Sequence, residues 1–92
     1  MPTYTVRFKP SALEGLNRLP PKIRQQVSKR IDALQENPRP PKMEHLGEGR
    51  YRVRSGDFRI VYRIEDDVLV VLVLSVDDRK DVYRKKGARR WE

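Results

Sequence analysis

Arginine recurs at short, regular intervals in residues 50–64, which read RYRVRSGDFRIVYRI. The five arginines are Arg50, Arg52, Arg54, Arg59 and Arg63. A guanidinium is permanently charged and offers a planar fork of N–H donors that matches the oxygens of a phosphate. Same-sign charges on paired strands repel one another and cost stability unless an anion binds. The pattern favours a phosphate-binding surface; the simpler alternative is a solvated outer face.

A second candidate pair lies near the end of the chain, where Arg79 and Tyr83 are four residues apart. On a helix these residues share one face. Positive charge nearby favours the phenolate form of a tyrosine, so Tyr83 could move a proton, and its ring could instead stack on a base. Spacing alone favours a plainer interpretation, in which Tyr83 is an amphipathic core residue with its hydroxyl at the edge.

Several other kinds of chemistry lack their residues. The chain has no cysteine and a single histidine, His45, which excludes disulfides, thiolate chemistry and multi-histidine metal sites. His45 and Glu48 are expected to be ordinary loop residues. The acidic pairs fall at expected turn or helix-cap positions and do not indicate a metal site; they are Asp66, Asp67, Asp77 and Asp78. We therefore expect no metal and no cofactor.

The element that carries the arginines is predicted to be a β-hairpin. Apolar and charged residues alternate on both sides of the turn signal Ser-Gly-Asp at 55–57. The alternation places the apolar side chains on one face, namely Tyr51, Val53, Phe58, Ile60, Tyr62 and Ile64. The arginines then converge on the opposite face, with Val61 among them.

The remaining segments supply the layers around this hairpin. Residues 3–8 alternate like a strand, and two amphipathic helices are predicted within 11–19 and 22–37, the second with Ile23, Val27, Ile31 and Leu34 on one stripe. Residues 37–49 are predicted to be a connection. The apolar run 68–76 predicts a central strand. Asp77 and Asp78 are expected to cap a short C-terminal helix that ends before Gly87.

The resulting order, β-α-α-β-β-β-α, predicts a single α+β domain over residues 1–92. We expect a small antiparallel-type sheet with two N-terminal helices on one face and a short C-terminal helix. A net charge of +8 and a pI near 10.2 predict binding to nucleic acid, an anionic membrane surface or an acidic protein. The longest apolar run is too short to span a bilayer, and the first ten residues lack a signal-peptide pattern, so the expected location is cytoplasmic with no membrane partner.

The order of elements and several motifs resemble the RelE/ParE superfamily of toxins from type II toxin–antitoxin modules. The most specific motifs are YRVRSGDFRIVYRI, the apolar central strand, and SVDDRKDVY at 75–83. The chain is most similar to the RelE branch, whose members are ribosome-dependent endoribonucleases. This resemblance implies cleavage of mRNA in the ribosomal A site without metal, by attack of a 2′-hydroxyl on the neighbouring phosphate, and a cognate acidic antitoxin as partner.

The resemblance also implies roles for individual residues. The matching catalytic positions are Arg52, Arg54, Arg59, Arg79 and Tyr83, and the accompanying RNA-binding positions are Arg50, Arg63 and Lys80. Arg59 and Arg79 would neutralise charge that develops on the scissile phosphate. Tyr83 would stack on or orient the base, or share in proton transfer.

One departure from the family pattern concerns the general base. Well-known RelE toxins carry lysines where this chain has Arg52 and Arg54, and arginine essentially cannot lose its proton. Either Tyr83 is then the base, or catalysis relies mainly on positioning and electrostatics. Two alternatives stay open: a ParE-like toxin that inhibits DNA gyrase without cutting RNA, and a basic RNA-binding module without chemistry.

Overall fold

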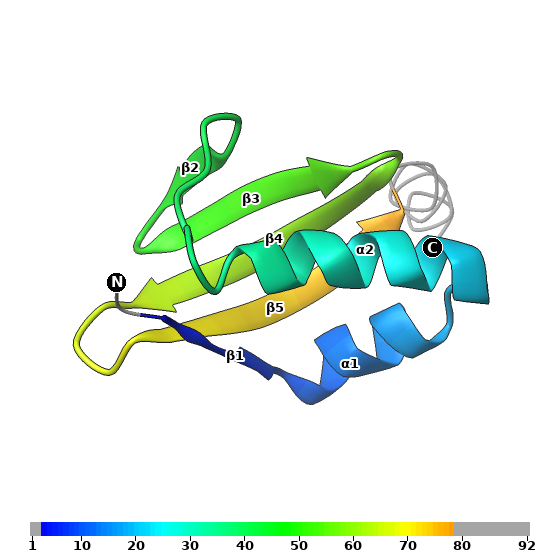
Figure 1. Ribbon diagram of the computed structural model, residues 1–92, viewed down its shortest axis with the longest axis horizontal. Helices are drawn as coiled ribbons and strands as arrows, with labels where there is room; N and C mark the ends of the chain where they lie inside the picture. Colours follow the sequence, from blue (N-terminus) through cyan, green and yellow to red (C-terminus); the bar gives the residue numbers. More distant parts are fainter. Residues whose placement is uncertain (1–2, 79–92) are drawn as a thin grey trace, which may run out of the picture.

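Two helices and five strands make up the part of the chain that the computed structural model describes, residues 3–78 (Figure 1). In chain order the elements are β1 (Thr5–Phe8), α1 (Pro10–Asn17), α2 (Pro21–Ala33), β2 (Glu44–Gly47), β3 (Arg50–Ser55), β4 (Phe58–Glu65) and β5 (Val70–Asp78). The predicted α+β class, the helix pair and the arginine hairpin are confirmed. The predicted C-terminal helix lies outside the described residues.

Both helices begin at a proline, Pro10 in α1 and Pro21 in α2. Proline suits the first helical position because its missing N–H would have no intrahelical acceptor there. The stripe predicted for the second helix packs inward, with Val27, Ile31 and Leu34 buried and Ile23 partly buried. No helix within residues 3–78 combines the length and apolar character needed to cross a membrane.

The strands form one sheet in the order β1-β5-β4-β3-β2. Strands β2 to β5 are antiparallel neighbours, as expected, whereas β1 runs parallel to β5. The parallel pairing arises because α1 and α2 carry the chain from β1 to the far edge of the sheet, from which the remaining strands return one by one. This connection leaves β2 and β1 as the two edge strands.

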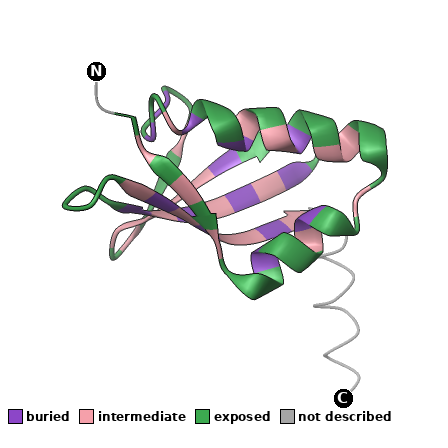
Figure 2. Ribbon diagram, turned by 60° about the horizontal axis from the view of Figure 1, so that its bottom comes forward, coloured by how far each residue is buried: buried purple, intermediate pink, exposed green. Residues whose placement is uncertain are grey.

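The core lies between the helices and one face of the sheet (Figure 2). Alternate residues of β4 are buried there, in the order Phe58, Ile60, Tyr62 and Ile64. In β5 the buried residues are Val71, Val73 and Val76, so the spacing changes from two to three. A bulge causes this change: Val61 pairs with Ser75 and Tyr62 with Val73, which leaves Leu74 as the extra residue.

Three local predictions were wrong. The connection 37–49 contains β2, which pairs with β3, and a turn in which Gly47, Glu48 and Gly49 all have positive φ. The last strand begins at Val70 because Val68 and Leu69 form an exposed turn. It continues through Asp77 and Asp78, which pair with Arg59 and Phe58 and therefore extend the sheet rather than cap a helix.

Candidate functional site

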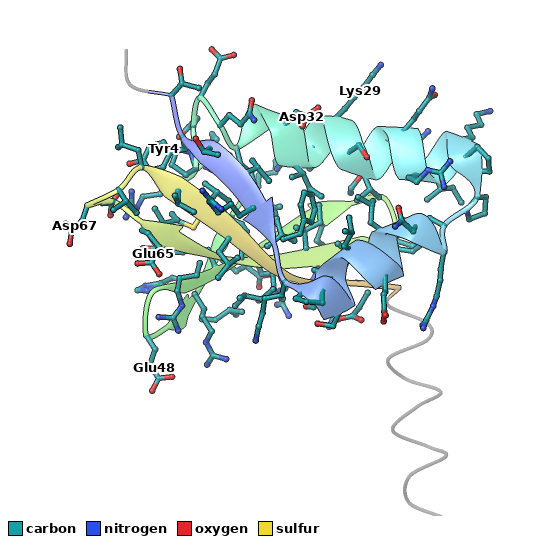
Figure 3. The ribbon with its side chains drawn as sticks, turned by 90° about the horizontal axis from the view of Figure 1, so that it is seen from below. Tyr4, Lys29, Asp32, Glu48, Glu65 and Asp67 are labelled. Carbon is teal, nitrogen blue, oxygen red and sulfur yellow. The ribbon has the colours of Figure 1, made fainter. Side chains whose placement is uncertain are left out.

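All five arginines of the hairpin lie on the face of the sheet opposite the helices. Successive residues of a strand point to opposite faces, and the neighbours of these arginines, Val53 and Ile60, are buried under the helices. We call this surface the arginine face, defined by Arg50, Arg52, Arg54, Arg59 and Arg63. The predicted convergence of these residues is confirmed. Figure 3 shows side chains with nitrogen ends gathered on the side of the sheet away from α2.

The strand register brings like charges into direct opposition. Arg50 pairs with Arg63, and Arg54 pairs with Arg59. The backbone N–H of Ile64 donates to the oxygen of Gly49, so Gly49 and Ile64, next to the pair Arg50 and Arg63, form a hydrogen-bonded pair. Hydrogen-bonded and non-hydrogen-bonded pairs alternate along an antiparallel ladder, so both arginine pairs are non-hydrogen-bonded pairs. At such pairs the side chains of opposite residues approach most closely. Direct opposition of like charges is unfavourable, which makes the face ready to accept an anion.

Two carboxylates offset part of this charge. Glu44 of β2 lies opposite Arg52, accepts a hydrogen bond from its Nε at 2.8 Å and forms an ion pair with its Nη2 at 2.7 Å. Glu48 lies 3.6 Å from Arg50 and is largely exposed. Among the described residues, Arg54, Arg59 and Arg63 form no ion pair. The arginines without an ion pair therefore lie near the turn and on β4, where Asp77 of β5 is the acidic residue opposite Arg59.

The pKa of Glu44 reflects its hydrogen bond to Arg52 and the nearby arginines. The hydrogen bond from Arg52 lowers the pKa of Glu44 below its ordinary value of 4.5, and the charges of Arg54 and Arg59 act in the same direction. Glu44 is therefore ionised at neutral pH and holds the Arg52 guanidinium in place. Sequence reasoning missed Glu44 because it placed residues 37–49 in a connection. The Gly-Glu-Gly turn before the hairpin was the signal for an additional strand.

The Nε atoms of Arg50 and Arg59 are buried, and neither has a hydrogen-bond partner among the described residues. Burial at Nε holds both guanidiniums close to the sheet instead of extending them into solvent. A buried donor without an acceptor costs roughly 1–3 kcal/mol. An anion bound at this face would therefore meet the outer nitrogens of these guanidiniums and not the buried Nε atoms.

Two further cations approach this face from outside the hairpin. Arg30 of α2 donates from Nε to the backbone oxygen of Arg54 at 3.3 Å. Arg30 and Lys42 line a cavity of about 330 Å³ together with Glu44 and Arg54. Arg30 and Lys42 are 24 and 12 positions before Arg54 in the chain. No local pattern in the sequence connects them to the hairpin.

The other end of the sheet is organised by an ion pair and stacked rings. Arg39 binds Asp66 at 2.9 Å, and the Tyr4 hydroxyl donates to the same carboxylate at 2.6 Å. These two hydrogen bonds lower the pKa of Asp66 below 3.8. His45, predicted to be a loop residue, instead lies in β2 and stacks on Tyr51 with ring centroids 4.8 Å apart. Asp66 is thus engaged in this structural cluster.

Three predicted site residues, Arg79, Lys80 and Tyr83, lie outside the described residues. The described residues end at Asp78, the last residue of β5. Asp77 pairs with Arg59 in the sheet, so the chain leaves the described region beside the arginine face. The roles assigned to Arg79, Lys80 and Tyr83 stay predictions from the sequence.

The five-stranded sheet with two helices on one face matches the fold of known proteins to which the chain is similar. Residues 6–83 match the family model of the ParE toxin of the type II toxin–antitoxin system parDE. The chain therefore belongs to the RelE/ParE superfamily of type II toxin–antitoxin toxins.

Its relatives within the superfamily include RelE-type toxins. The chain is 37% identical over 87 residues to Toxin RelG of Mycobacterium tuberculosis, covering 89% of this chain and 98% of the relative. It is 31% identical over 91 residues to the mRNA interferase toxin RelE of Escherichia coli K12, covering 94% and 96%. In the RelBE2 toxin–antitoxin complex of M. tuberculosis, one chain superimposes with a TM-score of 0.76 at 35% identity, over 86% of this chain and 94% of that chain.

Proposed function

We propose that this toxin is a ribosome-dependent endoribonuclease that cuts mRNA and thereby inhibits translation. The observation that carries the proposal is the arginine face, with Arg54, Arg59 and Arg63 unpaired among the described residues. A relative with 31% identity over nearly the whole chain is named an mRNA interferase, which supports the same activity here.

The proposed reaction is an internal transesterification. The 2′-oxygen of one nucleotide attacks the adjacent phosphorus, the bond from phosphorus to the 5′-oxygen breaks, and the products are a 2′,3′-cyclic phosphate and a free 5′-hydroxyl. One proton leaves the 2′-hydroxyl and one reaches the departing 5′-oxygen. Negative charge grows on the phosphoryl oxygens during attack, and fixed cations stabilise that charge most where water is excluded.

Arg59 and Arg54 are proposed to bind the scissile phosphate, since they lie directly opposite each other on neighbouring strands. Arg79 would complete this clamp from the segment after β5. Arg52 is held by Glu44 and would orient the flanking chain. Arg50, Arg63 and Lys80 would bind neighbouring phosphates. Tyr83 is the proposed base or stacking residue, because neither Arg52 nor Arg54 can give up a proton.

The partner that controls this activity is proposed to be a small acidic antitoxin. A structural relative is a toxin–antitoxin complex, RelBE2. Carboxylates placed opposite the arginine face would bind it and block access of RNA. In the absence of such a partner, a net charge of +8 favours association with RNA-rich particles such as the ribosome.

The test is cleavage of a defined mRNA on translating ribosomes with purified toxin. We expect cuts within the A-site codon, and fragments that end in a 2′,3′-cyclic phosphate, detected by their resistance to 3′-end ligation until the cyclic phosphate has been opened and the resulting terminal phosphate removed. The same toxin should cut the free mRNA far more slowly.

A second candidate function is inhibition of DNA gyrase, favoured by the match to the ParE toxin family model. A supercoiling assay with purified gyrase tests it in parallel. Inhibition of gyrase together with intact mRNA on ribosomes would contradict the proposed nuclease and support this alternative.

A further inference from the structure

The free edge of β3 beside α2 is a distinct feature of the molecule. Strand β2 pairs with β3 only as far as Arg52, so Arg54 lies beyond the end of β2. The backbone oxygen of Arg54 is therefore available to Arg30 of α2, which donates to it at 3.3 Å. This hydrogen bond fixes the Arg30 side chain at the edge where the arginine face meets the helix layer.

A cavity of about 330 Å³ opens at this edge, lined by Arg30, Lys42, Glu44 and Arg54. Three of the four lining side chains are cations, and none of the three has an ion-pair partner among the described residues. The one carboxylate, Glu44, already binds Arg52 through its Oε1 atom. The cavity therefore keeps an excess of positive charge that comes from three different elements of the chain.

The free oxygen of Glu44 adds a second kind of recognition. Both contacts from Arg52 reach Oε1, and Oε2 has no hydrogen-bond partner among the described residues. Its pKa is lowered by Arg52, so this oxygen is a hydrogen-bond acceptor at neutral pH. A ribose 2′-hydroxyl can donate to such an acceptor, whereas a phosphate oxygen or a partner carboxylate cannot.

We propose that this cavity is a subsite for one nucleotide of RNA outside the scissile position, with its phosphate bound by Arg30 and Lys42 and its ribose 2′-hydroxyl bound by Glu44. The inference rests on the proposed function in that RNA is the ligand. Arg54 belongs to both the arginine face and the cavity, so the RNA backbone would continue from one to the other around the edge of β3. A volume of about 330 Å³ accommodates a phosphate with its sugar.

The test measures RNA binding without cleavage. The full chain carrying Arg59→Ala, which keeps the probe intact, is titrated against a short fluorescent single-stranded RNA at several salt concentrations. Adding Arg30→Gln or Lys42→Gln alone should weaken binding about tenfold, with little change in the slope of log K against log salt because the other cation still contacts the phosphate. The double variant should reduce that slope by about 0.7, the value for loss of one phosphate contact on a single strand.

Lys29→Gln is the matched control. It removes the same charge from the same helix, but Lys29 is exposed and projects away from the sheet (Figure 3). Its salt slope should stay at the parent value. Glu44→Gln should reduce the preference for RNA over DNA of the same sequence, because the amide at this position no longer offers two carboxylate acceptors. Circular dichroism confirms that each variant is folded.

Several outcomes would overturn the subsite. Equal effects of Lys29→Gln and Arg30→Gln would mean that only the overall charge matters. A glutamate-rich peptide serves as a second probe. If Arg30→Gln and Lys42→Gln weaken binding of this peptide but leave RNA binding intact, the cavity would be assigned to an acidic protein partner instead. Failure of both the Arg59→Ala parent and the wild-type chain to bind RNA would also contradict the subsite. Because cleavage is not measured here, a toxin that binds as expected yet leaves mRNA on ribosomes uncut would contradict the proposed function alone.

Discussion

Arg59 combines more of the features expected of a phosphate-binding residue than any other described side chain of the hairpin. It pairs with Arg54 on one side and Asp77 on the other, and its Nε is buried without a described partner. Arg59→Ala should reduce single-turnover cleavage on ribosomes by about 10²–10³-fold, as expected for removal of one transition-state donor.

The same substitution should leave the free energy of unfolding within about 0.5 kcal/mol of wild type or raise it, because it removes one member of a like-charge pair. Urea unfolding measures this. Arg7→Ala is the control, since Arg7 lies on the same sheet face but on the edge strand β1, which β5 separates from the hairpin. Cleavage by a folded Arg59→Ala variant at the rate of wild type would remove Arg59 from the site.

Tyr83 can be tested although it lies outside the described residues, because two substitutions separate its possible roles. Tyr83→Phe keeps the ring and removes the hydroxyl, whereas Tyr83→Ala removes both. If the hydroxyl transfers a proton, Phe should slow single-turnover cleavage by about 10²-fold or more. If only stacking matters, Phe should match wild type and Ala should lose about 1–3 kcal/mol of binding. Wild-type rates for both would leave Tyr83 a structural residue.

At the scale of elements, Gly15 shows how tertiary packing reverses a local preference. Within an exposed helix, Gly→Ala gains about 1 kcal/mol. Here a Cβ at position 15 would lie 2.9 Å from the backbone oxygen of Val76, which cannot rotate away because it belongs to β5. Gly15→Ala should therefore separate α1 from β5 and lower the free energy of unfolding by about 1–3 kcal/mol. A stabilised variant in urea unfolding would show that α1 shifts freely.

Tyr62 joins the central strand β4 to the connection after α2. Its ring is fully buried, and its hydroxyl donates to the backbone oxygen of the buried residue Pro38 at 2.7 Å. Burial raises the pKa of Tyr62 to about 12 from an ordinary value of 10.0. The folded state thus keeps this proton when the unfolded state has lost it. The stabilisation is complete below pH 10 and declines as the pH rises from 10 to 12, by about 2–3 kcal/mol in total.

Tyr62→Phe should lower the free energy of unfolding by about 1–2 kcal/mol at pH 7, because the Pro38 oxygen loses its donor. Between pH 10 and 11 the variant should lose less stability per pH unit than wild type. Urea unfolding at pH 7, 10 and 11 measures both effects. Parallel losses in the two proteins over the alkaline range would show that Tyr62 does not carry this pH dependence.

The whole molecule presents one strongly basic face and one apolar core, and the proposed antitoxin has to neutralise the former. We expect the toxin–antitoxin complex to weaken steeply with salt, and Arg54→Gln to reduce antitoxin affinity more than Arg7→Gln does. Isothermal titration at two salt concentrations tests this. Affinity that is independent of salt and of Arg54 would contradict binding through the arginine face.

We predict that the C-terminal segment takes part in regulating the site. This segment follows Asp78 in the sequence and includes Gly87 and Trp91. If the antitoxin acts by displacing this segment together with Tyr83, deletion of residues 88–92 should change either antitoxin affinity or cleavage measurably. Deletion without effect on both would leave direct burial of the arginines as the mode of inhibition.

The sequence by itself determined the two faces of the hairpin, the inward stripe of α2 and the convergence of five arginines. These features depend on side-chain periodicity, and a period of two or of 3.6 residues is written directly into the order of apolar and charged residues. The resemblance in the motifs also led from the sequence to the superfamily that the comparisons confirm. The roles of Arg79, Lys80 and Tyr83 still depend on the sequence alone.

Only the tertiary structure decided which distant residues meet. Strand β2 is four residues long and has no periodicity strong enough to predict it, yet its pairing with β3 delivers Glu44 to Arg52. Strand β2 extends along β3 only as far as Arg52. The backbone oxygen of Arg54 can therefore accept a hydrogen bond from Arg30, which is 24 positions earlier in the chain. Periodicity specifies the face on which a side chain lies, but the partner on that face is set by strand register and helix packing, which arise when the whole chain folds.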